Sequence, residues 1–207
     1  MSGSLFNSPI ISLLCLFFAV IIHEVAHGWV ADRLGDPTAR ISGRLTLNPL
    51  AHIDVIGSIV VPFFLIITGS PILFGWAKPV PIDPYNLRNP RKDQTLISLA
   101  GAMANLFLAS FCALLLFLGA TSLRGIFIPM IQINVFLAIL NLIPIYPLDG
   151  FKVVEGLLSE HAARQWHQLE SLGYIMLFIF VFPLFGFSPL LSIVYKIANS
   201  IITFLIP

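Results

Sequence analysis

The sequence predicts an all-α integral membrane protein with about five transmembrane helices and a re-entrant or hairpin segment near residues 55–84. Of the 207 residues, 57% are hydrophobic and only 10% are charged, and the mean hydropathy is +0.94. A soluble domain of this length is far less apolar. The apolar residues also form several runs of about 20 residues, the length that a helix needs to cross a bilayer.

The first expected span is residues 9–30, long enough at about 1.5 Å per residue to cross about 30 Å of hydrocarbon. The residues before it lack the basic flank of a signal peptide, so we expect this run to remain as the first transmembrane helix. Residues 31–54 form a polar, turn-rich loop with Arg33, Arg40 and Arg44, and this loop should lie outside the membrane core.

The next apolar run, residues 55–74, has spanning length but is interrupted by two glycines and two prolines. A broken, re-entrant path is possible for such a run where neighbouring protein shields its backbone. Residues 75–84, with the sequence GWAKPVPIDP, contain too many prolines for a regular helix and predict an extended or hairpin segment.

The second half of the chain contains further spans. Residues 95–119 form a span with a face of small residues suited to close helix packing. Residues 126–145 form another, which ends in NLIPIYPLDG, where prolines break the helix and Asp149 follows just past its end. Residues 151–170 are polar and should lie at the interface, and the apolar runs 171–187 and 189–206 complete the chain.

Three polar side chains, His23, Glu24 and His27, interrupt the first expected span. Ionisable groups at membrane depth cost several kcal/mol, so they require a compensating partner, and a metal ion is one. At positions i and i+4 of a helix the two histidines share a face and can hold one zinc ion, with Glu24 placed to act on a zinc-bound water. Asp149 is the best available third ligand, although an Asp-Gly pair is also a common turn.

A shared zinc site constrains the path of the chain. If His23, His27 and Asp149 bind one ion, the first span and the 126–145 span end at the same depth and run in the same direction. The 95–119 span supplies the one crossing between them, so residues 55–74 should make no net crossing. The loops with most Lys and Arg then share one face, opposite Arg124, and the positive-inside rule makes that face cytoplasmic. The zinc site should lie toward the cytoplasm.

The motifs HEVAHG at residues 23–28 and NLIPIYPLDG at residues 141–150 resemble the site-2 proteases, a family of intramembrane zinc metalloproteases. SGRLTLNPLAHID at 42–54, FGWAKPVPIDP at 74–84 and SLAGAMANLFLA at 98–109 resemble the connecting motifs of its compact bacterial branch without a PDZ domain. The resemblance implies a Zn²⁺ cofactor, a multi-pass protein of the bacterial cell membrane and a transmembrane protein substrate. It implies cleavage of a peptide bond in or near the transmembrane segment of that substrate.

The same resemblance implies roles for individual residues: His23, His27 and Asp149 as zinc ligands and Glu24 as the base. It also implies that the segment around residues 75–81 forms a membrane-embedded hairpin. The edge of this hairpin would hold the substrate in extended form by strand addition, and its residues are Gly75, Trp76, Ala77 and Lys78. We therefore expect one polytopic metalloprotease domain over residues 1–207, with a catalytic core at about 9–150 and C-terminal helices at about 171–206.

The remaining polar residues and the two cysteines have expected roles outside the ligand set. Asn141 is a candidate to donate to the oxyanion or to the substrate backbone, or else forms a hydrogen bond between helices. Asn105 is expected to aid helix packing rather than catalysis. His52, His161 and His167 lie in predicted loops without ligand spacing and are interpreted as solvated or interfacial. Cys15 and Cys112 are interpreted as small core residues rather than a disulfide.

Three classes of protein could carry these residues: a protease, a zinc transporter and an inactive binding protein. The net charge of +1 with scattered Lys and Arg excludes a nucleic-acid-binding surface. A zinc transporter could place His and Asp in a membrane, but it has no need of Glu24 between the histidines. A catalytically inactive binding protein of the same fold is the third class, and the intact set of four site residues argues against it. The sequence favours the protease.

Overall fold

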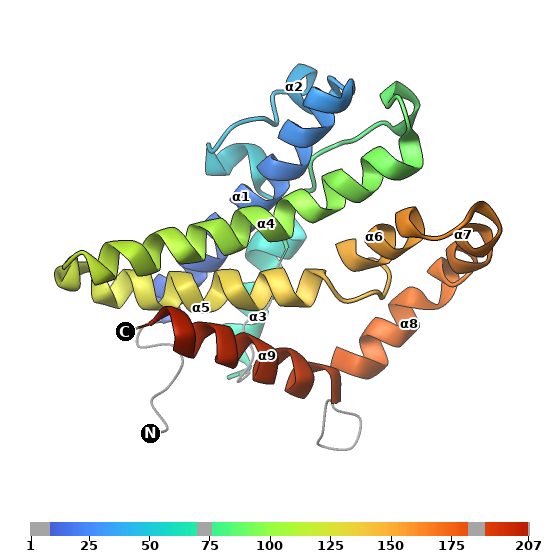
Figure 1. Ribbon diagram of the computed structural model, residues 1–207. Coiled ribbons are helices and arrows are strands. Elements are labelled where there is room, and N and C mark those ends of the chain that lie inside the picture. Colours follow the sequence, from blue (N-terminus) through green and yellow to red (C-terminus); the bar gives the residue numbers. More distant parts are fainter. Residues whose placement is uncertain (1–8, 70–75, 182–188, 207) are drawn as a thin grey trace.

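The computed structural model describes residues 9–69, 76–181 and 189–206, and within them it contains helices and no β-strand (Figure 1). This confirms the all-α class. The helices are α1 Pro9–Leu34, α2 Thr38–Ile41, α3 Val61–Ile67, α4 Pro90–Phe117, α5 Arg124–Asn141, α6 Asp149–Leu157, α7 Glu160–His167, α8 Glu170–Val181 and α9 Pro189–Leu205. Short 3₁₀ turns cover Pro49–His52 and Pro84–Asn86, and a π-helical turn, Val55–Val60, precedes α3.

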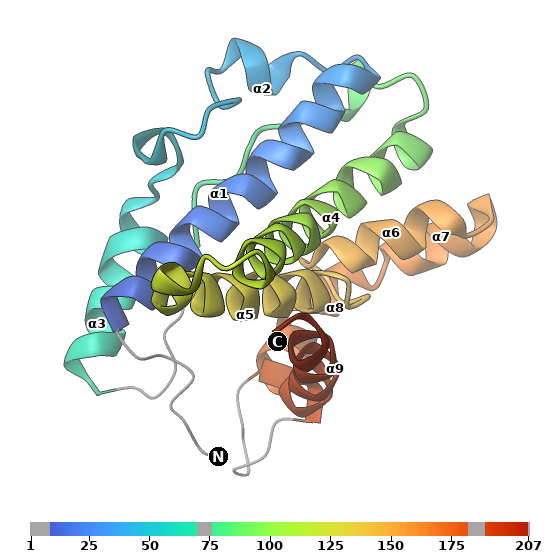
Figure 2. The same cartoon turned by 60° about the vertical axis from the view of Figure 1, so that its left-hand side comes forward.

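Helices α1, α4 and α5 form the centre of the molecule, with α4 packed against both others (Figure 2). Among the described residues, three helical segments are long and apolar enough to cross a membrane: Ile10–Leu34, Pro90–Phe117 and Thr121–Asn141. These match three of the predicted spans. Helices α8 and α9 have 12 and 17 residues, fewer than the roughly 20 of a full span, and residues 182–188 between them lie outside the described residues.

Small residues allow the central helices to approach closely. Ala102, Asn105 and Ala109 of α4 are fully buried, and further along α4 the side chains of Cys112 and Leu116 pack against α5 and α9. Large apolar side chains instead cover the outer surfaces of the helices. Such an extensive exposed apolar surface would be unstable in water and suits the lipid chains of a bilayer.

The described chain on either side of residues 70–75 meets at one level of the molecule. Asp54 precedes the segment of residues 55–76, and its carboxylate accepts a 2.7 Å hydrogen bond from the Gly57 N–H. The Trp76 N–H then donates to the Gly57 carbonyl at 3.1 Å, and the Lys78 N–H donates to the His52 carbonyl at 2.9 Å. The two ends of this segment are therefore side by side, which agrees with the prediction that it makes no net crossing. Residues 70–75 lie outside the described part.

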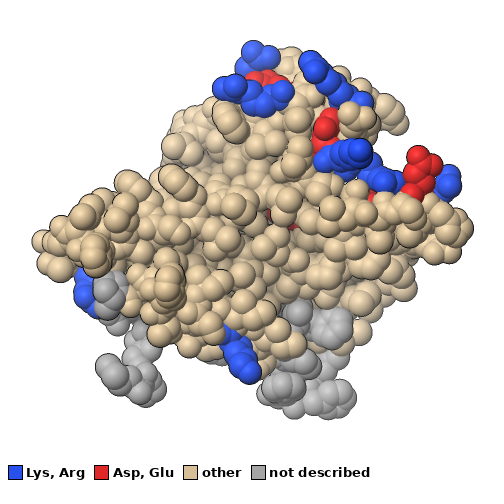
Figure 3. Space-filling view, in the orientation of Figure 1, with Lys and Arg blue, Asp and Glu red and all other residues tan. Residues whose placement is uncertain are grey.

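Most charged side chains gather at one end of the molecule. Figure 3 shows Lys, Arg, Asp and Glu at the top and upper right, over α2, the start of α4 and helices α6 and α7, and two separate basic patches at the lower left and at the bottom. Arg40 and Asp32 form one ion pair of this group at 3.1 Å. Arg124 begins α5 beyond the far end of α4, away from this group. The asymmetry is the one that the sequence predicts.

Asp36 joins the end of α1 to the extended segment that precedes α4. Its side chain is fully buried and accepts hydrogen bonds from the Thr38 N–H at 3.1 Å, the Asn86 side-chain amide at 2.9 Å and the Asp83 N–H at 2.7 Å. The Thr38 hydroxyl donates to the same carboxylate. Burial alone would raise the pKa of Asp36, but these hydrogen bonds outweigh it and lower the pKa below its ordinary value.

We expect Asp36→Asn to lower the free energy of unfolding by about 1–3 kcal/mol at neutral pH, because an amide cannot accept all of these bonds. Since the folded-state pKa is lowered, the carboxylate stabilises the fold above its unfolded pKa of about 4 and loses this effect as the pH falls through the folded-state pKa. Thermal unfolding in detergent between pH 7 and pH 3 should show the difference from wild type shrinking. Exposed Glu160→Gln is the matched control and should not show it.

Candidate metal centre

Helix α1 presents His23 and His27 one turn apart, with their ring centroids 4.5 Å apart and their planes at 89°. Asp149, the first residue of α6, lies against both rings. Its Oδ2 atom is 2.9 Å from His23 Nε2 and 3.1 Å from His27 Nε2. Ligand atoms of all three residues lie within 4.8 Å of one another. The structure thus brings together the three residues that the sequence analysis proposed as ligands.

The other ring nitrogen of each histidine fixes its tautomer. His27 Nδ1 lies 2.6 Å from the Ile97 carbonyl, which can only accept, so Nδ1 carries the proton. His23 Nδ1 lies 2.7 Å from Asn105 Oδ1. The Asn105 amide nitrogen already donates to the Ala19 carbonyl at 3.2 Å and to Asn134 Oδ1 at 2.6 Å, so Oδ1 of Asn105 accepts from His23. Both Nε2 atoms therefore present lone pairs toward Asp149.

Asp149 Oδ2 thus lies within hydrogen-bonding distance of both Nε2 atoms, where either a proton on an imidazole or a bound cation can link the three side chains. A metal ion at the centre would neutralise the buried carboxylate and use the Nε2 lone pairs of both neutral rings. Two imidazole nitrogens and one carboxylate oxygen form an established ligand set for catalytic zinc, with a fourth position left for water. Both histidines are buried, and the Asp149 side chain is 15% exposed. The residues fit Zn²⁺.

Helix α4 crosses directly over the two rings at Gly101. A Cβ atom added at Gly101 would lie 2.5 Å from His23 Cε1 and 2.6 Å from His27 Cε1, closer than real contacts allow. The missing side chain lets α4 approach α1 near enough for Ile97 and Asn105, one turn to either side of Gly101, to reach the histidines. Gly101 is therefore part of the site through its lack of a Cβ atom.

Asp149 lies further from α5 than the sequence suggested. Helix α5 ends at Asn141, and a non-helical turn with a cis Tyr146–Pro147 bond leads to α6, where Asp149 is the first residue. Helix α6 packs along α4. Phe151 of α6 stacks on Trp166 of α7 with ring centroids 5.2 Å apart, and the Trp166 indole donates to the Phe151 carbonyl at 3.0 Å. These contacts hold the first turn of α6, and with it Asp149, against α1.

Glu24 contacts the extended segment at residues 76–83, here called the strap. Its Oε2 accepts a 2.9 Å hydrogen bond from the Val80 N–H. Within the described residues, Oε1 makes no hydrogen bond and remains available. Glu24 is adjacent to His23 in the sequence and on the same turn of α1 as His27. One of its two oxygens thus holds the carboxylate beside the cluster of His23, His27 and Asp149.

The remaining predicted site residues are those of the proposed substrate edge, residues 75–78, and Asn141. Trp76, Ala77 and Lys78 lie in the strap, which is extended and pairs with His52 and Gly57 through single backbone hydrogen bonds. Gly75 lies outside the described residues. The Asn141 amide donates to the Leu137 carbonyl of its own helix at 3.1 Å, and its role toward substrate stays a prediction.

The interpretation of His52 as solvated or interfacial is wrong. The residue is fully buried, with its Nε2 2.8 Å from the Thr46 carbonyl, and its own carbonyl accepts a hydrogen bond from the Lys78 N–H of the strap. His167 agrees with the interpretation: it is 63% exposed and lies 3.2 Å from Glu155. His161 is exposed as well. Both cysteines are free and buried, as predicted.

The role of Asn105 is larger than the sequence predicts. Instead of only aiding packing, Asn105 holds His23, and Asn134 in turn holds Asn105. A signal was present, because an amide in the middle of an apolar span must find a partner, but the identity of the partner depends on how the helices pack. The Ile97 carbonyl that holds His27 has no sequence signal, since every residue has a carbonyl.

Comparison with known proteins shows which family the chain resembles. The model of peptidase family M50 matches residues 118–184. The chain is 37% identical over 184 residues to “Putative zinc metalloprotease YwhC” of Bacillus subtilis, covering 83% of this chain and 80% of that protein. It is 29% and 30% identical to proteins named “Putative zinc metalloprotease Rip2” from Mycolicibacterium smegmatis and Mycobacterium tuberculosis, covering 78% of this chain and 62% of each relative. No solved structure matches the chain.

We expect Asn105→Ala to weaken zinc binding about tenfold to hundredfold, because His23 loses the acceptor that fixes its tautomer and ring orientation. Competition with a zinc chelator on the purified protein measures this affinity. Asn199→Ala on exposed α9 is the matched control and should bind zinc as wild type does. Unchanged affinity of the Asn105 variant would mean that the hydrogen bond does not orient the ligand.

Gly101→Ala should also weaken zinc binding, by about tenfold or more, because the added methyl group overlaps both imidazoles and displaces α4 from α1. The same chelator competition applies. Gly125→Ala is the control, since a Cβ atom at Gly125 would contact nothing within 4 Å. Equal affinities of the two variants would contradict the close approach of α4 to the rings.

Proposed function

The chain belongs to peptidase family M50, the site-2 protease family, and is a zinc-dependent membrane protease; from this premise we propose that it hydrolyses a peptide bond in or near the transmembrane segment of a membrane protein. The single observation that carries the proposal is the position of the cluster of His23, His27 and Asp149. Two of these residues lie within a helix long enough to span a membrane, and both are buried there. A peptide bond must come to that depth to react.

We propose that His23, His27 and Asp149 bind the zinc ion and that Glu24 is the general base. Bound zinc supplies Lewis acidity toward the substrate carbonyl and lowers the pKa of a coordinated water to about 7. Glu24 accepts the proton of the attacking water on its free Oε1 and donates it to the leaving amine. The Val80 N–H, which holds Oε2, keeps the carboxylate oriented during both transfers. Asn141 remains our candidate donor to the substrate backbone.

The strap supports the idea that substrate binds as an added strand along residues 75–78. In an extended chain, alternate residues direct their backbone groups to opposite sides. The N–H groups of Trp76, Lys78 and Val80 donate to Gly57, His52 and Glu24 on one side of the strap. Ala77 faces the other side, where an extended substrate segment could pair with it.

The distribution of charge supports an active site toward the cytoplasm of a bacterial cell. The end of the molecule with most Lys and Arg is the end at which α1 finishes and α4 begins (Figure 3). By the positive-inside rule this end is cytoplasmic. His27 lies in the last third of α1, nearer to that end than to the other.

Two other functions fit parts of the site. A zinc transporter would use the same three ligands, but it gives no reason for a carboxylate held beside them by the Val80 N–H. An inactive binding protein of the same fold would have no need to keep all four residues. Both alternatives predict no cleavage by the zinc-loaded wild type, and this distinguishes them from a protease.

We expect Glu24→Gln to retain zinc and to lower the rate of peptide cleavage by about 100-fold to 10,000-fold, since the amide cannot accept the proton. The assay is cleavage of a reporter transmembrane substrate by purified, zinc-loaded protein in lipid vesicles, together with its metal content. Glu160→Gln, an exposed carboxylate on α7, is the matched control and should cleave normally.

Cleavage at the wild-type rate by zinc-loaded Glu24→Gln would refute the role of Glu24. Absence of cleavage by the wild type with a full complement of zinc would favour the transporter or the binding protein. Absence of zinc from the wild type purified without chelators would favour the binding protein alone.

A further inference from the structure

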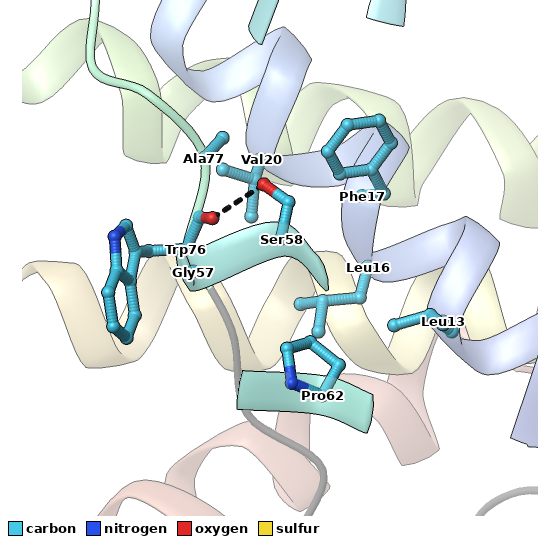
Figure 4. A pocket seen from close by; sticks show the side chains of 9 residues that line it. All are labelled: Leu13, Leu16, Phe17, Val20, Gly57, Ser58, Pro62, Trp76 and Ala77. Carbon is cyan, nitrogen blue, oxygen red and sulfur yellow. Dashed lines mark hydrogen bonds between the residues drawn. The ribbon is translucent and has the colours of Figure 1, made fainter. Parts of the chain in front are cut away.

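A small apolar pocket lies between α1 and the strap. Figure 4 shows its lining side chains, which come from α1 on one side and from the turn before α3, the start of α3 and the strap on the other. The lining residues are Leu13, Leu16, Phe17, Val20, Gly57, Ser58, Pro62, Trp76 and Ala77. The Ser58 hydroxyl donates to the Trp76 carbonyl at 2.8 Å and fixes the strap at the edge of the pocket.

The pocket continues the catalytic face of α1. Leu13, Leu16 and Val20 follow one another on this helix at spacings of three and four, and Glu24 lies four positions after Val20. Residues at this spacing share one face of a helix. Val20 is one helical turn, about 5.4 Å, from Glu24. The pocket therefore lies beside the proposed reaction centre, at a distance that about two residues of an extended chain would span.

The strap offers backbone groups at the same place. Ala77 is buried and lines the pocket, yet among the described residues its N–H and carbonyl make no hydrogen bond. Buried backbone groups without partners are rare, because leaving them unpaired costs free energy. An extended peptide beside Ala77 would supply the missing partners and direct a side chain toward the pocket.

The size and character of the pocket limit what it can receive. The cavity volume is about 20 Å³, enough for one water-sized group. Its walls are almost entirely apolar side chains, and Trp76 closes one side by lying directly over Gly57, where any Cβ atom would overlap the indole ring. A methyl group fits this space, and we expect a branched or aromatic side chain to enter it less readily.

We propose that this pocket is a substrate subsite that selects a small side chain, such as that of Ala, one or two residues from the bond that is cleaved. The inference rests on the proposed function, since it presupposes that a peptide is cleaved beside Glu24. It goes further by assigning a specificity role to Leu16 and Val20. The substrates would then be transmembrane segments with a small residue at this position.

The test uses a reporter transmembrane substrate with a mapped cleavage site, in which each residue within three positions of that site is changed in turn to Ala, Leu or Phe. For the wild type, kcat/KM should fall about tenfold to hundredfold from Ala to Leu at one position, one or two residues from the bond. Leu16→Ala and Val20→Ala, which enlarge the pocket, should reduce this Leu-to-Ala discrimination at least severalfold.

Leu14→Ala is the matched control, because Leu14 lies on the same helix but is 64% exposed and does not line the pocket. Its discrimination should equal that of the wild type. Leu16 also packs against the cluster of Cys15, Ala19 and Ile133, so its variant is less stable, but a ratio of two substrates does not depend on the amount of folded enzyme.

The outcomes separate the two proposals. Cleavage by the wild type with no dependence on side-chain size at any position would overturn the subsite and leave the protease intact. A size preference that neither pocket variant changes would also overturn it. Failure of the zinc-loaded wild type to cleave any of the substrates would overturn the proposed function and this inference together.

Discussion

The structure depends on the convergence of three polar side chains at one point inside a membrane protein. His23, His27 and Asp149 lie together among apolar helices, with both histidines buried, and their ligand atoms lie within 4.8 Å of one another. The chain of Asn134, Asn105 and His23 fixes one tautomer, and the Ile97 carbonyl fixes the other. Much of the packing between α1, α4 and α5 can be understood as the support for this arrangement.

The strap connects the chemistry to the rest of the fold. It pairs with the turn before α3 at Gly57, covers His52, holds Glu24 through Val80 and is fastened by Asp36 near its end. One extended segment therefore links the turn before α3, Glu24 and the polar end of the molecule. Its free side at Ala77 borders a pocket, so the segment that holds the proposed base is also the one suited to orient a peptide.

The sequence predicted the parts of the site that depend on local rules. Helical periodicity places His23 and His27 together, and the glycines and prolines of residues 55–74 predict a path without a net crossing. The pairing of Asp149 with α1 followed from its motif. The burial of His52 and the hold of Asn105 on His23 could not be predicted, because each depends on which segment packs over a residue rather than on its spacing. The extent of α6 as a separate helix was missed for the same reason.

The separation of the ligands along the chain governs when the site can form. Asp149 follows His23 by 126 positions, so a ribosome has made α1, α4 and α5 before it reaches the third ligand. During synthesis and insertion the nascent chain then holds only two of the three proposed ligands, beside Glu24. The complete proposed set exists only after α6 has docked on α4, so a zinc site of this composition requires the assembled bundle.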